Sequence, residues 1–244
     1  MKYITPDWPA PKNVKAFSTT RLGWGKRRPH HQQNDGNFSA SIRDYVVESD
    51  KIVSLLGLPS EPLWIHQTHS TIAIEATLEN REKNADASFT NQPKHVCAIV
   101  TADCLPVLIC DKRGTRVAAA HAGWRGLANG IIENTIHQLQ IPTSELLVWL
   151  GPAIGPEKFE VGRDVHDAFV QKHPESATAF KPHQPEKWLA NLYELARLRL
   201  ALQGVPTTGI YGGNHCTFTQ DDLFFSYRRD KGHLGRIASV IWFE

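Results

Sequence analysis

Short apolar runs, each ended by turn-forming residues, are the clearest pattern in the middle of the chain. Three follow one another at residues 96–101, 106–110 and 117–120, separated by an Ala-Asp-Cys turn and a Lys-Arg-Gly turn. Short apolar runs bounded by such turns are typical of buried strands. The same pattern predicts further strands at residues 14–18, 63–66, 71–74, 146–150 and 237–243.

Side chains that recur about four positions apart predict the helices. The series from Leu127 to Leu139 keeps this spacing, and Pro142 lies just beyond its end. A recurrence close to the helical repeat places such residues on one face of a helix. The pattern also predicts a helix at 44–56 stopped by Gly57, a helix capped by Asp164 over Val165, Ala168 and Phe169, and a helix from Leu189 to near Gly204.

The order of these elements predicts an α+β fold. Strands and helices are mixed without a steady strand–helix–strand rhythm, which argues against a Rossmann fold and favours mixed sheets with flanking helices. The segment 21–37 is rich in Gly, Pro, Asn and His and is predicted to be a long loop. No repeat, low-complexity tract or linker divides the chain, so residues 1–244 are expected to form one domain.

Composition narrows the range of partners. The chain has 244 residues, 41% of them hydrophobic, and a net charge of +2 with the basic residues scattered. Nucleic acid is therefore not expected as the main partner. No apolar run is long enough for a membrane helix, and the N-terminal residues do not resemble a signal peptide. Four widely separated cysteines without an export signal favour reduced thiols in the cytoplasm.

Candidate metal ligands stand where predicted strands end. They are His69, Cys104 and His121, and two imidazoles with one thiolate suit zinc. Three protein ligands leave a fourth position open, as in catalytic zinc sites. For any single cysteine, burial in the core is the simpler explanation. His66 competes with His69 for the same role, and His215 with Cys216 forms a second-choice ligand pair.

Two further segments could bind phosphate. Gly123, Arg125 and Gly126 lie between His121 and the start of a predicted helix, where free backbone N–H groups favour anions. Arg228 and Arg229 follow an aromatic strand, and arginine binds phosphate through a planar fork of donors. One of these two arginines is expected to form only an ion pair with Asp230, and Arg21 is the alternative candidate for phosphate.

Four motifs, in order, resemble the YfiH or laccase-domain family. They are Ala-Asp-Cys-Leu-Pro-Val at 102–107, Ala-His-Ala-Gly-Trp-Arg-Gly at 120–126, Leu-Gly-Pro-Ala-Ile-Gly-Pro at 150–156 and Phe-Ser-Tyr-Arg-Arg-Asp at 225–230. The resemblance runs from the Ser-Thr-Thr-Arg segment at 18–21 to the C-terminus. It implies a zinc held by His69, Cys104 and His121, and so selects His69 over His66. Members of this family have been called polyphenol oxidases and are now regarded as purine nucleoside phosphorylases.

The sequence departs from the family pattern before the first ligand. Where members usually carry Asn-Leu-Gly, Gly-Asp and Glu-Asn-Arg, this chain has Asn-Asp-Gly at 34–36, Ala-Ser at 40–41 and Glu-Ser-Asp at 48–50. The Gln-Val-His-Gly segment becomes Gln-Thr-His-Ser at 67–70. The ligands remain, but the departures bear on substrate preference and on the level of activity.

Three functions follow from the resemblance and the ligand set. The first is phosphorolysis of adenosine, inosine or methylthioadenosine, with zinc as cofactor and adenosine deamination as an accompanying activity. The second is copper-dependent oxidation of phenols, because two His and one Cys also suit copper. The only adjacent histidine pair, His30-His31, offers little for the several coppers of a laccase. The third is editing of peptidoglycan precursors. The expected partners are purine nucleosides and phosphate, and the expected state is a monomer or homodimer.

Overall fold

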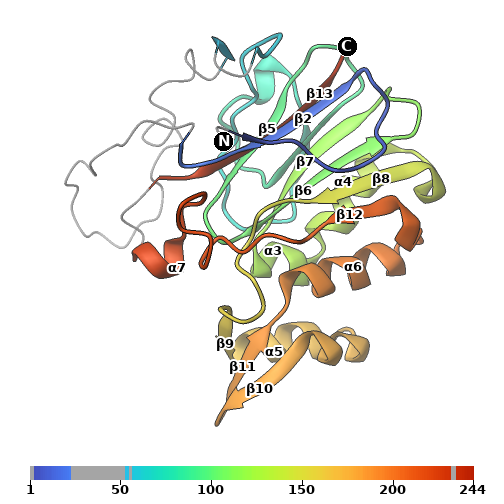
Figure 1. The fold of residues 1–244 in the computed structure, drawn as a ribbon. Helices are drawn as coiled ribbons and strands as arrows, with labels where there is room; N and C mark the ends of the chain where they lie inside the picture. The colour runs from blue at the N-terminus through green and yellow to red at the C-terminus, as the bar shows by residue number, and fades with distance from the viewer. Residues whose placement is uncertain (1–2, 23–52, 55–56, 232–234) are drawn as a thin grey trace.

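The computed structural model describes residues 3–22, 53–54, 57–231 and 235–244. Its largest element is a six-stranded mixed sheet in the order β12-β8-β6-β7-β4-β3 (Figure 1). The two outermost pairs, β12 with β8 and β3 with β4, are parallel, and the inner pairs are antiparallel. The strands are β3 (Ala73–Glu75), β4 (Ala87–Thr90), β6 (Leu105–Asp111), β7 (Val117–Ala122), β8 (Leu146–Leu150) and β12 (Ile210–Gly212).

A four-stranded sheet packs against one face of the six-stranded sheet. Its order is β1-β2-β13-β5, formed by β1 (Tyr3–Ile4), β2 (Val14–Thr19), β13 (Ile237–Phe243) and β5 (Cys97–Thr101). Alternate residues of β6, such as Leu108 and Cys110, join residues of β2, β5 and β13 in the core between the two sheets. Side chains alternate across a strand, so the intervening Val107 and Ile109 face the opposite way.

Helices cover that opposite face of the six-stranded sheet. They are α3 (Trp124–Asn129), α4 (Ile131–Leu139) and α6 (Leu192–Leu202), and their buried residues join Val107 and Ile109 in one core. The side chain of Asn191 caps α6 by accepting hydrogen bonds from the amides of Tyr193 and Glu194. The fold is therefore layered, with two sheets and then helices (Figure 1).

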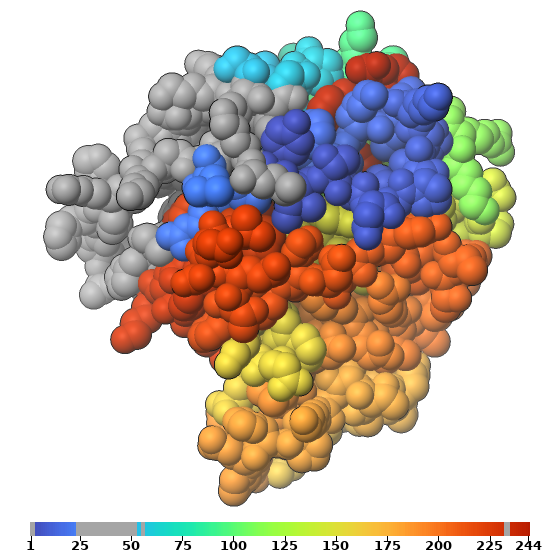
Figure 2. All heavy atoms as spheres, viewed as in Figure 1, coloured from blue at the N-terminus to red at the C-terminus, as the bar shows by residue number. Residues whose placement is uncertain are grey.

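A smaller unit projects from the layered body. It contains α5 (Arg163–Val170) and a three-stranded sheet of β9 (Glu160–Gly162), β10 (Phe180–Gln184) and β11 (Lys187–Ala190). This unit protrudes at the bottom of the molecule in Figure 2, in yellow and light orange. The remaining short elements are α7 (Tyr227–Asp230) and the 3₁₀ helices η1 (Leu78–Asn80), η2 (Thr143–Glu145), η3 (Pro174–Ala179) and η4 (Thr207–Gly209).

Most of the predicted strands are present. The prediction at 146–150 coincides with β8, and those at 14–18, 96–101, 106–110, 117–120 and 237–243 match β2, β5, β6, β7 and β13 within two residues at either end. The run at 63–66 is not a strand. It makes only isolated bridges, Leu63 to Cys97 and His66 to Asn84, and its apolar residues are buried by packing instead.

Three helix predictions need correction. The series from Leu127 to Leu139 spans two helices, because Gly130 has a φ of 109° and breaks the chain between α3 and α4. Asp164 does not cap α5, since the N-cap is Gly162 and no side chain caps this helix. Leu189 belongs to β11, so the helix predicted there begins later, at Leu192. The predicted helix at 44–56 and the departures at 34–50 lie outside the described residues, apart from helical residues 53–54.

The α+β prediction with mixed sheets and flanking helices is confirmed. Among the described residues, no helix has both the length and the apolar character needed to cross a membrane.

Candidate metal centre

Three side chains that are far apart in the sequence meet at one end of the interface between the two large sheets. One ligand atom from each of His69, Cys104 and His121 lies within 4.8 Å of the others. Within the described part of the chain, this is the one group of three or more His, Cys, Asp or Glu side chains that could hold a metal ion. The structure therefore brings together all three predicted ligands.

Each ligand is placed by a different element. Cys104 lies in the turn that carries the chain from β5, in the four-stranded sheet, to β6, in the six-stranded sheet. His121 is the last residue but one of β7 rather than lying beyond its end. By alternation along the strand it points to the same side as Val117 and Ala119, toward the space between the sheets. His69 lies in the loop before β3 with a φ of 60°.

A buried carboxylate holds both histidines in place. Asp86 has no exposed surface, and its Oδ1 accepts hydrogen bonds from the His121 ring Nδ1 at 2.8 Å and the His69 amide at 3.0 Å. Its Oδ2 accepts from the amides of Thr68 and Ser70, at 3.1 and 2.6 Å, and from the Ser70 hydroxyl at 2.7 Å. Successive amides that converge on one anion form a nest, which here stabilises the left-handed conformation of His69.

The contact with Asp86 also sets the protonation of His121. An acceptor at Nδ1 places the ring proton there, and Nε2 is left to bind a metal. The His69 Nε2 lies 3.8 Å from the Cys104 Sγ, so this nitrogen also faces the cluster. The arrangement is the carboxylate–histidine pair that commonly accompanies histidine ligands.

Electrostatics favour a thiolate at Cys104. Burial would raise the pKa of this thiol, but the charges and hydrogen bonds of His121 and His69 lower the pKa to about 6. Burial would lower the pKa of His121, yet the Cys104 thiolate and Asp86 raise it to about 9. By contrast, burial raises the pKa of Cys97 to about 12 and also raises the pKa of Cys110. Of these three thiols, only Cys104 has a pKa lowered toward the thiolate form that binds metals.

Gly123 leaves room for an ion beside these donors. A Cβ at this position would lie 2.6 Å from His69 Cδ2, 3.0 Å from His69 Nε2 and 3.2 Å from Cys104 Sγ. The space next to the donor atoms therefore depends on the missing side chain. Two imidazoles, a thiolate and this adjoining space fit a metal with one open coordination position.

The predicted anion-binding segment after Gly123 begins the helix α3, and its binding of an anion stays a prediction. The helix α3 has only six residues, which gives it a small dipole. Arg125 is exposed, and its guanidinium lies 4.3 Å from the centre of the Trp124 ring. Gly126 approaches the loop of the first ligand, since a Cβ there would lie 3.0 Å from the Ser70 carbonyl oxygen.

The two neighbouring arginines of α7 have different environments. Arg229 uses its guanidinium on the carbonyl oxygens of Thr217, Phe218 and Phe224 and on the Asp230 carboxylate. This is the ion pair that the sequence predicted for one of the two. Arg228 is exposed, and among the described residues its guanidinium donates to the Glu160 carbonyl oxygen alone, at 3.1 and 3.2 Å.

Arg21, which follows β2, contacts the C-terminal loop that leads to α7. Its guanidinium bonds the Asp221 carbonyl oxygen and lies 5.3 Å from the centre of the Phe225 ring. Its backbone amide also bonds the Leu223 carbonyl oxygen, which attaches the end of β2 to this loop.

The alternative ligands lie outside the cluster. His66 is not part of it, and the Cys216 Sγ accepts a hydrogen bond from the Gly155 amide at 3.2 Å. Sequence reasoning also missed Asp86 and Asp103. A single acidic residue between two alanines at 85–87, and one directly before Cys104, were the available signals.

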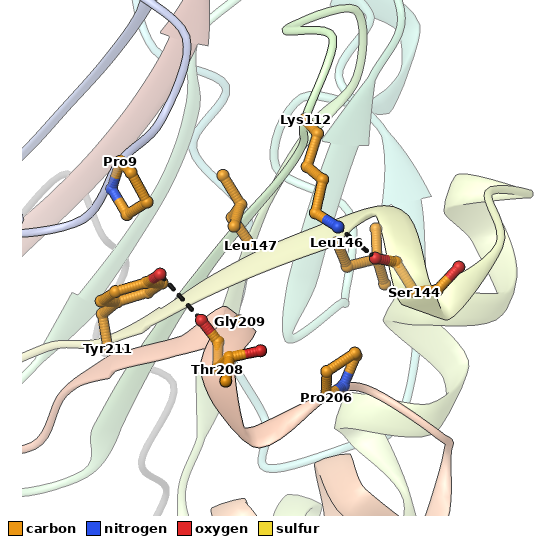
Figure 3. A pocket seen from close by; sticks show the side chains of 9 residues that line it. All are labelled: Pro9, Lys112, Ser144, Leu146, Leu147, Pro206, Thr208, Gly209 and Tyr211. Carbon is orange, nitrogen blue, oxygen red and sulfur yellow. Dashed lines mark hydrogen bonds between the residues drawn. The ribbon is translucent and has the colours of Figure 1, made fainter.

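A surface hollow of about 240 Å³ lies at the far end of the same strands (Figure 3). Lys112 Nζ in this hollow donates to the Ser144 carbonyl oxygen, and the Tyr211 hydroxyl donates to the Thr208 carbonyl oxygen. The side chains of Lys112 and Tyr211 are thus paired with the backbone, and the length of β6 separates the hollow from Cys104. The lining is Pro9, Lys112, Ser144, Leu146, Leu147, Pro206, Thr208, Gly209 and Tyr211.

Comparison with known proteins identifies the family. The family described as multi-copper polyphenol oxidoreductase laccase matches residues 15–244. The chain belongs to this family. An Escherichia coli member, named purine nucleoside phosphorylase YfiH, is 48% identical over 99% of this chain and 98% of its own. A Haemophilus influenzae member named purine nucleoside phosphorylase is 45% identical over the full length of both.

Solved structures of family members share the fold. The Neisseria meningitidis protein NMB0706 superposes with a TM-score of 0.86 at 46% identity and full coverage of both chains. YlmD from Geobacillus stearothermophilus superposes with a TM-score of 0.88 at 28% identity, covering 100% of this chain and 97% of that one. The resemblance to the YfiH family drawn from the four motifs is confirmed.

Proposed function

We propose that this protein is a zinc-dependent purine nucleoside phosphorylase whose reaction takes place at the His69–Cys104–His121 centre. The observation that carries the proposal is the convergence of these three donors beside Gly123. A second support is 48% identity, over nearly the whole chain, to a protein named purine nucleoside phosphorylase. The substrates are adenosine, inosine or methylthioadenosine together with inorganic phosphate.

The reaction needs no oxidant or reductant. The glycosidic bond between the ribose C1′ and the purine nitrogen breaks, and a phosphate oxygen forms a new bond to C1′. The base leaves with the bonding electron pair and gains a proton, so the products are the free purine and a ribose phosphate. Adenosine deamination, which the family resemblance also implies, would use water alone: a water oxygen would bond to C6 of the base, the amino group would leave as ammonia, and the product would be inosine.

The protein residues have distinct tasks at this centre. Bound zinc supplies a Lewis acid with an open coordination position. Asp86 holds the His121 ring in one tautomer and fixes the backbone of His69. The negative charge of the Cys104 thiolate would balance the charge of a bound cation. This matters because the site is buried, with His121 only 4% exposed. Such prior orientation lets charged groups act without rearrangement during the reaction.

Arg228 is the first choice for contacting phosphate. Its amide donates to Asp103 Oδ2 at 2.7 Å, directly beside Cys104, and its guanidinium is exposed and only partly used. Arg229 has no comparable freedom, because its donors are engaged by carbonyl oxygens and Asp230. Arg21 is the second choice, and Gly123 with Arg125 would contribute from the start of α3.

The proposal is tested by incubating zinc-loaded protein with each of the three nucleosides, with and without phosphate, and separating the products by chromatography. Free base should appear only with phosphate, and inosine formed from adenosine without phosphate would reveal deamination. Cys104→Ala should lose both most of the zinc and the phosphorolysis. Cys110→Ala is the matched control, because this buried cysteine lies on β6 at the end distant from the centre.

Two results would overturn the proposal. One is the absence of base release from any of the nucleosides by fully zinc-loaded protein. The other is phenol oxidation after copper loading without phosphorolysis, since two His and one Cys also suit copper. A multi-copper oxidase needs several copper sites, however, and the described residues contain one group of at least three donors.

A further inference from the structure

Asp103 occupies a strained position between the metal ligand Cys104 and the chain before it. It has a φ of 83°, a backbone conformation that non-glycine residues rarely adopt. Its carboxylate is buried, with 9% of the residue exposed. Strained backbone persists only where surrounding contacts hold it, and it clusters at functional sites.

The contacts of Asp103 gather three distant segments around this turn. Oδ1 accepts from the Thr217 hydroxyl at 2.6 Å, and Oδ2 accepts from the Ser226 hydroxyl at 3.0 Å and from the Arg228 amide at 2.7 Å. The Asp103 carbonyl oxygen accepts from the Ile154 amide at 2.9 Å. The residues bonded by the carboxylate are 114 to 125 positions away in the sequence.

Arg228 is consequently anchored through its backbone, while its guanidinium is exposed. Its backbone is tied to Asp103, and its guanidinium is tied to the Glu160 carbonyl oxygen. The same aspartate is bonded covalently to the metal ligand Cys104. One buried side chain therefore links the backbone of Arg228 to the turn that contains the metal ligand.

We infer that Asp103 is a positioning residue that aligns phosphate bound by Arg228 with the nucleoside at the metal centre. The inference rests on the proposed function, and it assigns Asp103 no contact with substrate. Its action is indirect, through the backbone of Arg228 and the loop that contains Thr217 and Ser226. Replacing a residue with this role should change the affinity for phosphate more than the affinity for the metal or for the nucleoside.

Asp111, the last residue of β6, provides a matched control. Its buried carboxylate also accepts three hydrogen bonds, from the Thr115 amide and hydroxyl and from the Arg116 amide. It lies at the opposite end of β6 from Asp103 and Cys104. Asp111→Ala therefore removes the same number of bonds to a carboxylate without touching the centre.

The experiment compares Asp103→Ala, Asp103→Asn and Asp111→Ala with the unmodified protein. We expect Asp103→Ala to raise the KM for phosphate roughly tenfold or more, the effect of losing one charge-assisted contact. Zinc content and the KM for nucleoside should change little. Asp103→Asn should recover part of the phosphate affinity, since an amide oxygen can still accept from Ser226 and Arg228. Asp111→Ala should lower thermal stability without changing the KM for phosphate.

A second measurement separates this inference from the proposed reaction. Inorganic phosphate is titrated against zinc-loaded protein while the midpoint of thermal unfolding is followed. The inference is supported if phosphate raises the unfolding midpoint of the unmodified protein and of Asp111→Ala but not that of Asp103→Ala. This holds even if no nucleoside is cleaved, in which case the proposed function would be wrong. The inference is overturned if phosphate does not bind the unmodified protein, if both alanine variants behave alike toward phosphate, or if Asp103→Ala loses zinc in proportion to activity.

Discussion

Replacing Asp86 by asparagine should disrupt the metal centre while keeping the shape of the side chain. The carboxylate accepts five hydrogen bonds in all, two at Oδ1 and three at Oδ2. An amide offers one acceptor oxygen and one donor nitrogen. If the oxygen takes the Oδ2 position, the NH₂ group faces the His121 Nδ1 and the His69 amide, and both contacts with Asp86 Oδ1 are lost.

The altered contact changes the tautomer of His121. An NH₂ group beside Nδ1 requires this nitrogen to accept, which moves the ring proton to Nε2, the nitrogen that faces the cluster. A protonated nitrogen cannot bind a metal. In the opposite orientation the NH₂ group opposes the amides of Thr68 and Ser70 and loosens the loop of His69. Both orientations of the introduced amide therefore weaken one ligand.

The expected loss of zinc affinity is about 10- to 100-fold, the usual effect of removing a partner of a histidine ligand, or roughly 1.4–2.7 kcal/mol. Asp86→Ala should also lower the free energy of unfolding, by about 3–5 kcal/mol, because it leaves several buried donors without a partner. Zinc affinity is measured by competition with a chromophoric chelator, and stability by calorimetry of the metal-free protein. Asp111→Asn is the control. Wild-type zinc affinity in a folded Asp86→Asn protein would refute the tautomer argument.

Two further predictions concern the space beside the donors and the paired arginines. Gly123→Ala should lose most of the bound zinc, because its methyl group would lie 2.6 Å from a carbon of the His69 ring. Gly130→Ala should instead lower stability through backbone strain and retain zinc. Metal analysis of both variants checks the difference. Arg228→Ala should raise the KM for phosphate roughly tenfold with little change in stability. Arg229→Ala should instead lower the free energy of unfolding by about 2–4 kcal/mol, measured by denaturant titration, since it removes bonds to three carbonyl oxygens.

The layered core could be predicted because its strands are buried on both faces. A strand covered by a second sheet and by helices consists of continuous apolar residues, and β8 accordingly has the same limits as the run at 146–150. The run at 63–66 is also mainly apolar, but its residues are buried by packing beside β5, with which the run forms one isolated bridge. Apolar content alone does not distinguish these two outcomes.

The strands of the projecting unit were missed for the opposite reason, although its helix α5 was predicted. In β10 every residue after Phe180 is exposed, and the strand includes a lysine, a proline and a histidine. Its conformation depends on pairing with β11, which supplies no local periodicity. Similarly, the spacing of four continues from Leu127 across the break at Gly130, because α3 and α4 pack against the same face of the sheet.

The residues that orient the site could not be recognised in the same way as the ligands. Histidine and cysteine stand out in a sequence because their chemistry suits a metal, whereas aspartate before a turn or between small residues is common. Arg228 and Arg229 are adjacent and chemically identical. Only the fold shows that the Arg229 guanidinium is hydrogen-bonded to several carbonyl oxygens, whereas that of Arg228 is exposed. Distinguishing them requires the path of the loop at 215–230.

The two buried aspartates divide the organisation of the centre between them. Asp86 connects the two histidines, and Asp103 is joined to the cysteine and to the backbone of Arg228. Neither bonds the other, so a defect in one should leave the partners of the other in place. Asp86 variants should therefore change metal affinity first, whereas Asp103 variants should change phosphate affinity first. This separation would allow metal binding and phosphate binding to be impaired independently in a centre whose three ligands come from three separate segments of the chain.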